Sequence, residues 1–203
     1  MAETSPRSHL VDIDIAEPIW DRFFHVAPLV LVGTLDEDGT PDLAPKHMVT
    51  PMGWQYYFGF VGTPRHSTCA NIERSGVFTV SYPRPQQILE TSLSASPRQD
   101  GGSKPILDYL PTSGAREVDG VVIDEAYLYF ECRHFKTIDG FGENCLITGS
   151  IVAAYGDARF VRASEHDDQD LIRESPLFAY LAPGRFATID TTNAFPFPAD
   201  MKK

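Results

Sequence analysis

The sequence lacks the features that mark membrane, secreted and nucleic-acid-binding proteins. It contains no run of 18 or more apolar residues, so we expect no membrane-spanning helix. Its first nine residues, MAETSPRSH, include no apolar segment of the kind that signal peptides carry. The net charge of −11 argues against nucleic acid as the main partner, because neutralising phosphates requires a basic face. These absences predict a cytoplasmic protein that binds neither membranes nor nucleic acids.

Cysteine is scarce, and the short motifs of several enzyme classes are absent. Only three cysteines occur, at wide spacing, which predicts free thiols in a reducing compartment. Cys132 and His134 could share one face of a strand and converge with Cys145. No fourth ligand follows at metal spacing, so we predict core packing and no metal site. The chain has no phosphate-binding P-loop, no Gly-x-Gly-x-x-Gly motif and no Gly-x-Ser-x-Gly nucleophile motif.

The composition of the chain is that of one globular domain. It has 203 residues, of which 42% are hydrophobic and 22% charged, as in folded proteins with a sizeable core. No internal repeat and no linker divides it. We therefore predict a single domain over residues 1–203, with a loose or strand-like N-terminal arm of about 16 residues and a proline-rich, extended tail after Asn193.

Alternating apolar patterns separated by turns predict a mainly β protein with a few short helices. The expected strands are Pro28–Asp36, Asp42–Thr50, Trp54–Val61, Val77–Ser81, Glu125–Ile138, Asn144–Tyr155 and Arg185–Ile189. The expected helices are Glu17–His25, Thr68–Ser75, Pro85–Leu93 and Asp167–Glu174. Residues 94–105 are predicted to form a loop because they are rich in Ser, Pro and Gly. Many strands joined by short turns favour an antiparallel barrel.

The segment Thr63–Ser81 predicts a loop, a helix and a strand, with a site for an anion where the helix starts. Ser67 is expected to cap the helix through its hydroxyl, and Gly76 to end it in the left-handed conformation that glycine adopts without strain. The free N–H groups of the first turn, the helix dipole, two hydroxyls and Arg65 suit a phosphate monoester. The alternative is an ordinary capped helix with a solvated Arg65, since most such helices bind no anion.

The same segment resembles part of a known family. Its pattern Arg-x-Ser-Thr-x-x-Asn-Ile-x-x-Ser-Gly-x-Phe-x-Val is similar to the phosphate-binding helix of the flavin reductase-like, FMN-binding split-barrel family, in its flavoredoxin-like branch. Further parts recur in order: the strand and turn Val30–Gly39, the strand PDLAPKHMV from Pro41, the phrase Phe-Glu-Cys from Phe130, and Gly-x-Asn-x-x-x-x-Gly over Gly142–Gly149. The resemblance covers about residues 20–190 and implies an antiparallel split β-barrel of Greek-key type.

The resemblance also implies contacts with FMN. Ala44, Lys46, His47 and Met48 would line the isoalloxazine ring, largely through backbone groups, and Thr63, Arg65, Ser67 and Thr68 would hold the phosphate. Asn71 lies one turn after Thr68, where it would either orient the phosphate-side groups or make a helix-to-loop hydrogen bond. Asn144 stands where many members carry a histidine that meets the nicotinamide. Asparagine can hydrogen-bond a carboxamide there, but it cannot act as an acid.

For function, the resemblance implies an FMN-dependent oxidoreductase that moves a hydride from NADH or NADPH to flavin N5 and passes electrons to oxygen, free flavin or a protein. Lys46 or His47 would stabilise negative charge near N1 of the reduced ring. The alternatives are an electron carrier reduced by a protein partner and a flavin-binding module without turnover. The family places the flavin at a dimer interface, so we expect a homodimer, with the aromatic strand Trp54–Phe60 in the core and the interface.

Overall fold

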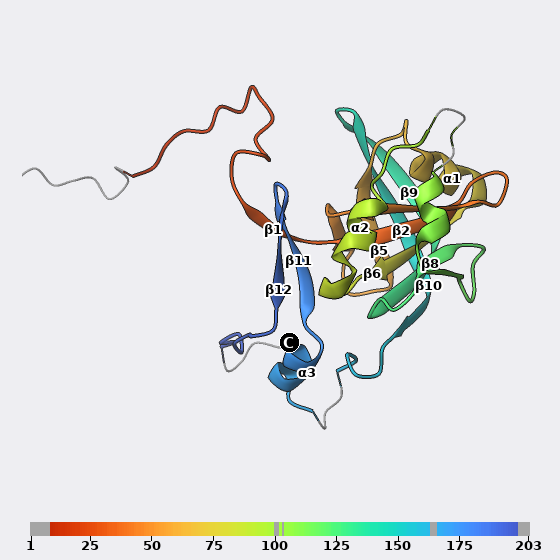
Figure 1. Cartoon of the computed structure of the whole chain (residues 1–203). Helices are drawn as coiled ribbons and strands as arrows, with labels where there is room; N and C mark the ends of the chain where they lie inside the picture. Colours follow the sequence, from red (N-terminus) through yellow and green to blue (C-terminus); the bar gives the residue numbers. More distant parts are fainter. Residues whose placement is uncertain (1–8, 100–101, 103, 163–165, 199–203) are drawn as a thin grey trace, which may run out of the picture.

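Antiparallel strands make up most of the chain. The computed structural model describes residues 9–99, 102, 104–162 and 166–198. Its largest sheet has seven strands in the spatial order β3-β2-β6-β9-β10-β5-β4, and all neighbours are antiparallel. They are β2 (Val30–Leu35), β3 (Pro41–Lys46), β4 (Val49–Pro51), β5 (Tyr57–Gly62), β6 (Val77–Tyr82), β9 (Leu128–Phe141) and β10 (Asn144–Gly156). The sheet curls into a half-barrel (Figure 1), which confirms the predicted fold class.

A second sheet stands beside the barrel, and the sequence patterns predict only part of it (Figure 1). Its strands are β1 (His25–Pro28), β11 (Leu177–Ala182) and β12 (Arg185–Ile189), in the order β1-β11-β12. The predicted helix at Glu17–His25 is wrong, because residues 17–24 form turns and bends and β1 begins at His25. Pairing of β1 with β11, far along the chain, overrides the local helix signals.

Short elements cover the barrel and connect its strands. They are α1 (Ser67–Ser75), the 3₁₀ turn η1 (Pro85–Gln87), which runs into α2 (Ile88–Leu93), η2 (Pro105–Tyr109), β7 (Thr112–Gly114), β8 (Val121–Ile123) and α3 (Asp168–Glu174). The predicted helices after Pro85 and before Glu174 are therefore present, the first of them with a 3₁₀ start. Among the described residues, no helix has the length and apolarity to cross a membrane.

Helix α1 ends as predicted but starts differently. Gly76 adopts a φ of 71°, and its N–H donates to the Ile72 carbonyl at 2.8 Å. His66, not Ser67, occupies the N-cap position, and the His66 side chain makes no capping hydrogen bond. The predicted Ser67 cap is wrong because Ser67 lies in the first turn, where its hydroxyl contacts Asp42 and Arg98 instead. The N–H groups at the start of α1 are thus left without a side-chain cap.

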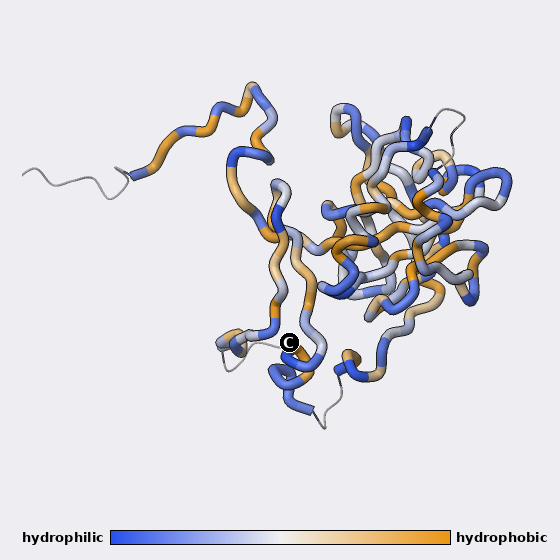
Figure 2. Tube along the Cα trace, viewed as in Figure 1, coloured by the Kyte–Doolittle hydropathy of each residue, from blue (hydrophilic) through white to orange (hydrophobic). Residues whose placement is uncertain are grey.

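The core lies on both faces of the barrel sheet. On one face Val30 and Val32 pack with Phe78 and with the buried side of α1, while Leu31 faces a second cluster that includes Ile123. Burial on both faces explains why β2 has a continuous apolar sequence rather than an alternating one. Figure 2 shows apolar segments throughout the barrel and further ones along the N-terminal arm.

The aromatic strand expected at Trp54–Val61 divides into a buried and an exposed part. It begins at Tyr57, and Phe58 and Phe60 are fully buried, as predicted. Trp54 precedes the strand with 97% of its surface exposed, and Tyr56 is 61% exposed, so neither belongs to the core of one chain. The predicted interface role of these two residues stays a prediction.

Candidate functional site

A cavity of about 660 Å³ opens at the N-terminus of α1. It is lined by β3 (Asp42, Ala44, Pro45, Lys46), by the start of α1 (Arg65, His66, Ser67, Thr68, Ala70), and by residues that follow α2 (Ser94, Ala95, Ser96, Pro97, Arg98, Lys104). Cys69 and Ile72, on the inner side of α1, are buried in the core. This anchoring holds the first turn of α1 against β3.

Four cationic side chains border the cavity: Lys46, Arg65, Arg98 and Lys104. One buried carboxylate, Asp42, stands among them, with Oδ1 at 3.2 Å from Arg98 Nη2 and 3.6 Å from Lys104 Nζ. Arg98 and Arg65 also pair with Asp36 and Glu143, so four cations stand against three carboxylates, and the positive end of the α1 dipole adds to the field of the cations. Such a combination of helix terminus and cations attracts phosphate-like anions.

Arg98 ties the segments around the cavity together. Its Nε donates to Ser67 Oγ at 2.9 Å, and its Nη1 and Nη2 donate to the Asp36 carboxylate at 2.7 and 3.0 Å. The Ser67 hydroxyl in turn donates to Asp42 Oδ2 at 3.3 Å. The hydrogen bonds with Asp36 raise the pKa of Arg98, so the guanidinium stays charged. The Arg98 guanidinium and the Ser67 hydroxyl are thus held in place by neighbouring residues before any ligand binds.

Asn71 makes the helix-to-loop hydrogen bonds that were one of its two expected roles. Its Nδ2 donates to Thr34 Oγ1 at 3.1 Å and to Asp36 Oδ1 at 2.8 Å, and the residue is 6% exposed. Asn71 does not line the cavity. It is linked to the cavity wall through Asp36, which also holds Arg98.

The loop before α1 reaches across to the start of β10. Arg65 lines the cavity with a side chain that is 67% exposed, and its Nη1 lies 2.9 Å from Glu143 Oε2. The Thr63 hydroxyl donates to Asn144 Oδ1 at 3.1 Å. The structure therefore brings Arg65 together with Ser67 and Thr68 at the cavity, whereas Thr63 and Asn144 contact each other outside it.

The residues expected along the flavin ring lie where three cavities meet. Ala44 and Lys46 line the 660 Å³ cavity, and the predicted strand Asp42–Thr50 breaks at His47 and Met48 into β3 and β4. His47 lines two neighbouring cavities, of about 380 Å³ and 410 Å³, and Met48 lines the second. The 380 Å³ cavity shares Pro45 and Ala95 with the first, so the two cavities are neighbours along β3.

Comparison with known proteins agrees with this architecture. Residues 22–170 match the flavin reductase like domain. The chain belongs to the flavin reductase-like family. Membership supports an oxidoreductase role and a flavin cofactor, and it confirms the resemblance found in the sequence.

Several solved structures share the fold of this chain at low identity. The flavoredoxin of Desulfovibrio vulgaris (Miyazaki F) superposes with a TM-score of 0.74 at 18% identity over 93% of this chain and 99% of its own. The 2-nitrobenzoate 2-nitroreductase of Pseudomonas fluorescens gives 0.73 at 20% identity over 87% of each chain. Nitrilotriacetate monooxygenase component B of Bacillus cereus gives 0.73 at 15% identity, over 97% of this chain and 98% of its own.

Burial changes the acidity of the basic groups in this flavin reductase-like site. It lowers the pKa of Lys46, and it also lowers the pKa of Lys104 despite the attraction of Asp42. The pKa of His47 is lowered first by burial and then by the neighbouring charges of His25 and Lys46. His47 is therefore mostly neutral at pH 7, and its ring can donate a hydrogen bond without adding charge.

Sequence reasoning missed two of the four cations. Arg98 and Lys104 lie in the stretch 94–105, whose Ser, Pro and Gly content predicts only a loop. The available signal was two cations in a segment that follows a predicted helix, but nothing local indicates that this segment folds back onto α1. The sequence around Ser67 does not indicate this fold-back either, because the hydrogen-bond donor Arg98 lies 31 residues later in the chain.

The cysteines and histidines do not converge on a metal site in the part of the chain that the structure describes. Cys132 is fully buried within the core, as predicted. His134 Nε2 lies 2.8 Å from Thr137 Oγ1 on the same strand. Cys145 contacts the Gly62 carbonyl through its Sγ at 3.7 Å.

Proposed function

We propose that this protein is an FMN-dependent oxidoreductase that takes a hydride from NADH or NADPH. The observation that carries the proposal is the 660 Å³ cavity, in which four cations surround the uncapped N-terminus of a helix. A phosphate monoester is the ligand that such a cavity suits. The chain has no dinucleotide motif for a second nucleotide half, which favours FMN over FAD.

In this proposal the phosphate lies at the start of α1, between Arg65 and Arg98, with the Thr68 and Ser67 hydroxyls as further partners. The ring extends along β3, past Ala44 and Lys46 to His47 and Met48. Asp42 is no obstacle to an anion, because Arg98 and Lys104 together compensate the charges of Asp42 and Asp36. The fit therefore follows from residues that the fold already holds together.

Bound FMN supplies the redox chemistry, and the protein contributes position and electrostatics. The Lys46 ammonium group and the neutral His47 ring stand beside the expected ring path, where they stabilise negative charge. Asn144 supplies no acid, and its amide oxygen is engaged by Thr63. Proton transfer to a substrate thus falls to solvent or to another side chain.

We further propose a homodimer in the cytoplasm. Exposed aromatic side chains, including Trp54, support the dimer, and three buried free thiols are compatible with a reducing compartment. A partner protein that receives the electrons would then dock at the interface where the two subunits hold the reduced flavin.

The test is rapid mixing of the FMN-loaded protein with NADH and, separately, with NADPH, under anaerobic conditions. Bleaching of the flavin absorption within the turnover time supports the proposal and gives the nicotinamide preference. The structural likeness to a flavoredoxin favours one second candidate, an electron carrier without a nicotinamide site. Bleaching by dithionite but by neither nucleotide would favour that candidate, and a protein that binds no flavin would contradict both.

A further inference from the structure

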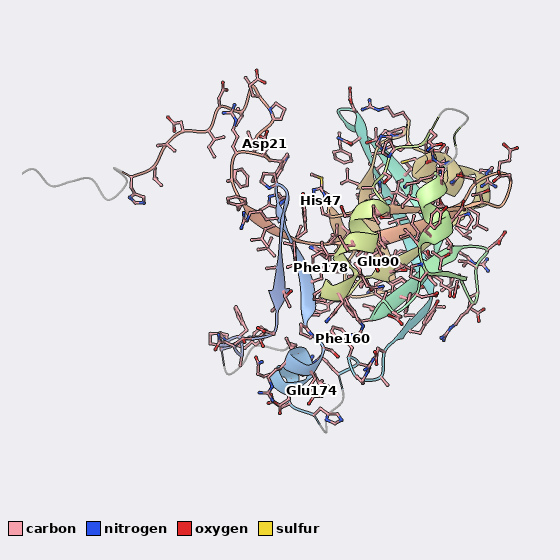
Figure 3. The ribbon with its side chains drawn as sticks, viewed as in Figure 1. Asp21, His47, Glu90, Phe160, Glu174 and Phe178 are labelled. Atoms are coloured by element: carbon pink, nitrogen blue, oxygen red, sulfur yellow. The ribbon has the colours of Figure 1, made fainter. Side chains whose placement is uncertain are left out.

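The 380 Å³ cavity beside the flavin site has a chemistry of its own. Its walls are apolar and aromatic, with Phe178 and Tyr180 from β11 and Phe186 from β12. Figure 3 labels Phe178 on this strand, with His47 and Glu90 of α2 nearby, where the small sheet approaches the barrel. A volume of this size lies within the range of small-molecule sites.

The aromatic side chains are held rigidly. The Tyr180 hydroxyl accepts a hydrogen bond from the Gly184 N–H at 2.8 Å, and its ring centroid lies 5.0 Å from that of His47. Phe178 and Phe186 meet edge to face at 5.6 Å. Such fixed rings favour a planar aromatic ligand, which can stack or pack edge to face against them.

Two polar groups of the cavity have no partner. Thr91 is 2% exposed, and its hydroxyl is buried without a hydrogen bond. A buried hydroxyl without a partner costs stability, which calls for an explanation such as a missing ligand. Arg185 lines the same cavity and makes no side-chain hydrogen bond or ion pair within the described residues.

We propose that this cavity binds a planar aromatic carboxylate, as the second substrate of the flavin site. The Arg185 guanidinium pairs with the carboxylate, for which its planar fork is suited. The Thr91 hydroxyl bonds a polar substituent on the ring, and the aromatic walls enclose the ring itself. A phosphate ligand suits the neighbouring cavity better, because four cations gather there and only one gathers here.

The role of this ligand as a second substrate rests on the proposed function, whereas its binding follows from the cavity alone. Pro45 and Ala95 line both cavities, so a ligand here lies next to the flavin site. His47 lies between this cavity and the 410 Å³ one. A ligand in the 380 Å³ cavity should therefore leave room for FMN.

The test is calorimetric titration of the protein with 4-hydroxybenzoate and with its uncharged methyl ester, before and after saturation with FMN. Arg185→Gln should weaken binding of the acid about tenfold and leave the ester unchanged, since a charge-assisted pair is lost. Arg133→Gln is the matched control, because Arg133 is also an exposed arginine on a strand and does not line the cavity. It should change neither affinity.

Thr91→Val adds a readout that a structural role would not give. It should weaken binding of the acid several-fold, while the melting temperature stays equal or rises because an unpaired buried hydroxyl is removed. Equal affinity in wild type and Arg185→Gln, or competition between the acid and FMN, would overturn the proposal. A protein that binds the acid through Arg185 but binds no FMN would keep this inference and refute the proposed function.

Discussion

Lys46 and Lys104 should make the binding of FMN in the 660 Å³ cavity depend on pH. Burial lowers the pKa of both side chains below the ordinary lysine value of 10.5, so they lose their charge at a lower pH than free lysine. The charged forms attract phosphate, and deprotonation therefore weakens FMN binding as the pH rises from neutral toward 10.5. Fluorescence titration across this range should show a falling ratio of FMN to riboflavin affinity.

Lys46→Met serves as the control for this pH effect. It removes one of the two titrating cations, so the decline should be shallower and the affinity at pH 7 lower. A ratio that stays constant from neutral to alkaline pH in the wild type would mean that neither lysine meets the phosphate.

The cysteines should be almost inert in the folded protein. Burial raises the pKa of Cys69 and of Cys132 to about 12, and it also raises the pKa of Cys145. Thiolate is the reactive form, so little reacts at pH 8. A disulfide reagent with a coloured leaving group should detect no thiol within minutes in the native state and three in guanidinium chloride. Rapid labelling of the native protein would contradict the burial of these side chains.

Substitution of two glycines in the barrel distinguishes the cost of backbone strain from the cost of a steric clash. Gly76 ends α1 with φ at 71°, but a Cβ there would meet nothing within 4 Å. Gly76→Ala should therefore cost about 1 kcal/mol, the strain of a left-handed alanine. In Gly33→Ala, a Cβ in β2 would lie 2.0 Å from the Val121 carbonyl oxygen, so β2 and β8 must separate. This change should cost more than about 3 kcal/mol.

Urea unfolding of both variants measures these costs. The order of stability should be wild type, then Gly76→Ala, then Gly33→Ala. A reversed order would mean that β8 can move away from β2 at little cost, or that the left-handed Gly76 stabilises α1 by more than about 1 kcal/mol.

The same elements show which features of the fold can be predicted from the sequence. Gly76 is predictable because a positive φ is a local requirement, and the barrel strands are predictable because their apolar patterns are local too. The Ser67 cap and the helix at Glu17–His25 fail because remote partners decide them: Arg98 for the serine hydroxyl and β11 for the β1 segment. The candidate anion site at the start of α1 could thus be predicted from sequence, but Arg98, which borders it, could not.

At the scale of the whole molecule, exposed apolar surface predicts association. Trp54 is 97% exposed, Phe24 65% and Phe135 62%, and further apolar residues follow the N-terminal arm (Figure 2). Large apolar side chains that are left exposed in one chain are candidates for an interface. Light scattering at micromolar concentration should give twice the chain mass of 22.5 kDa. A monomer that still binds FMN tightly would contradict a flavin site shared between subunits.

The central claim is that the α1 cavity holds the phosphate of FMN. Arg65→Ala should weaken FMN binding about tenfold, at the low end for a charge-assisted hydrogen bond because Arg65 is largely exposed and already pairs with Glu143. Riboflavin carries no phosphate, so its affinity should not change. Arg133→Ala, an exposed arginine away from the cavity, is the matched control and should alter neither affinity.

The deciding measurement is a fluorescence titration of FMN and riboflavin against the wild type and these two variants. The account predicts a loss that is confined to FMN and to Arg65→Ala. Equal losses for both flavins would show that Arg65 supports the ring or the fold, and no loss for either would place the phosphate outside this cavity.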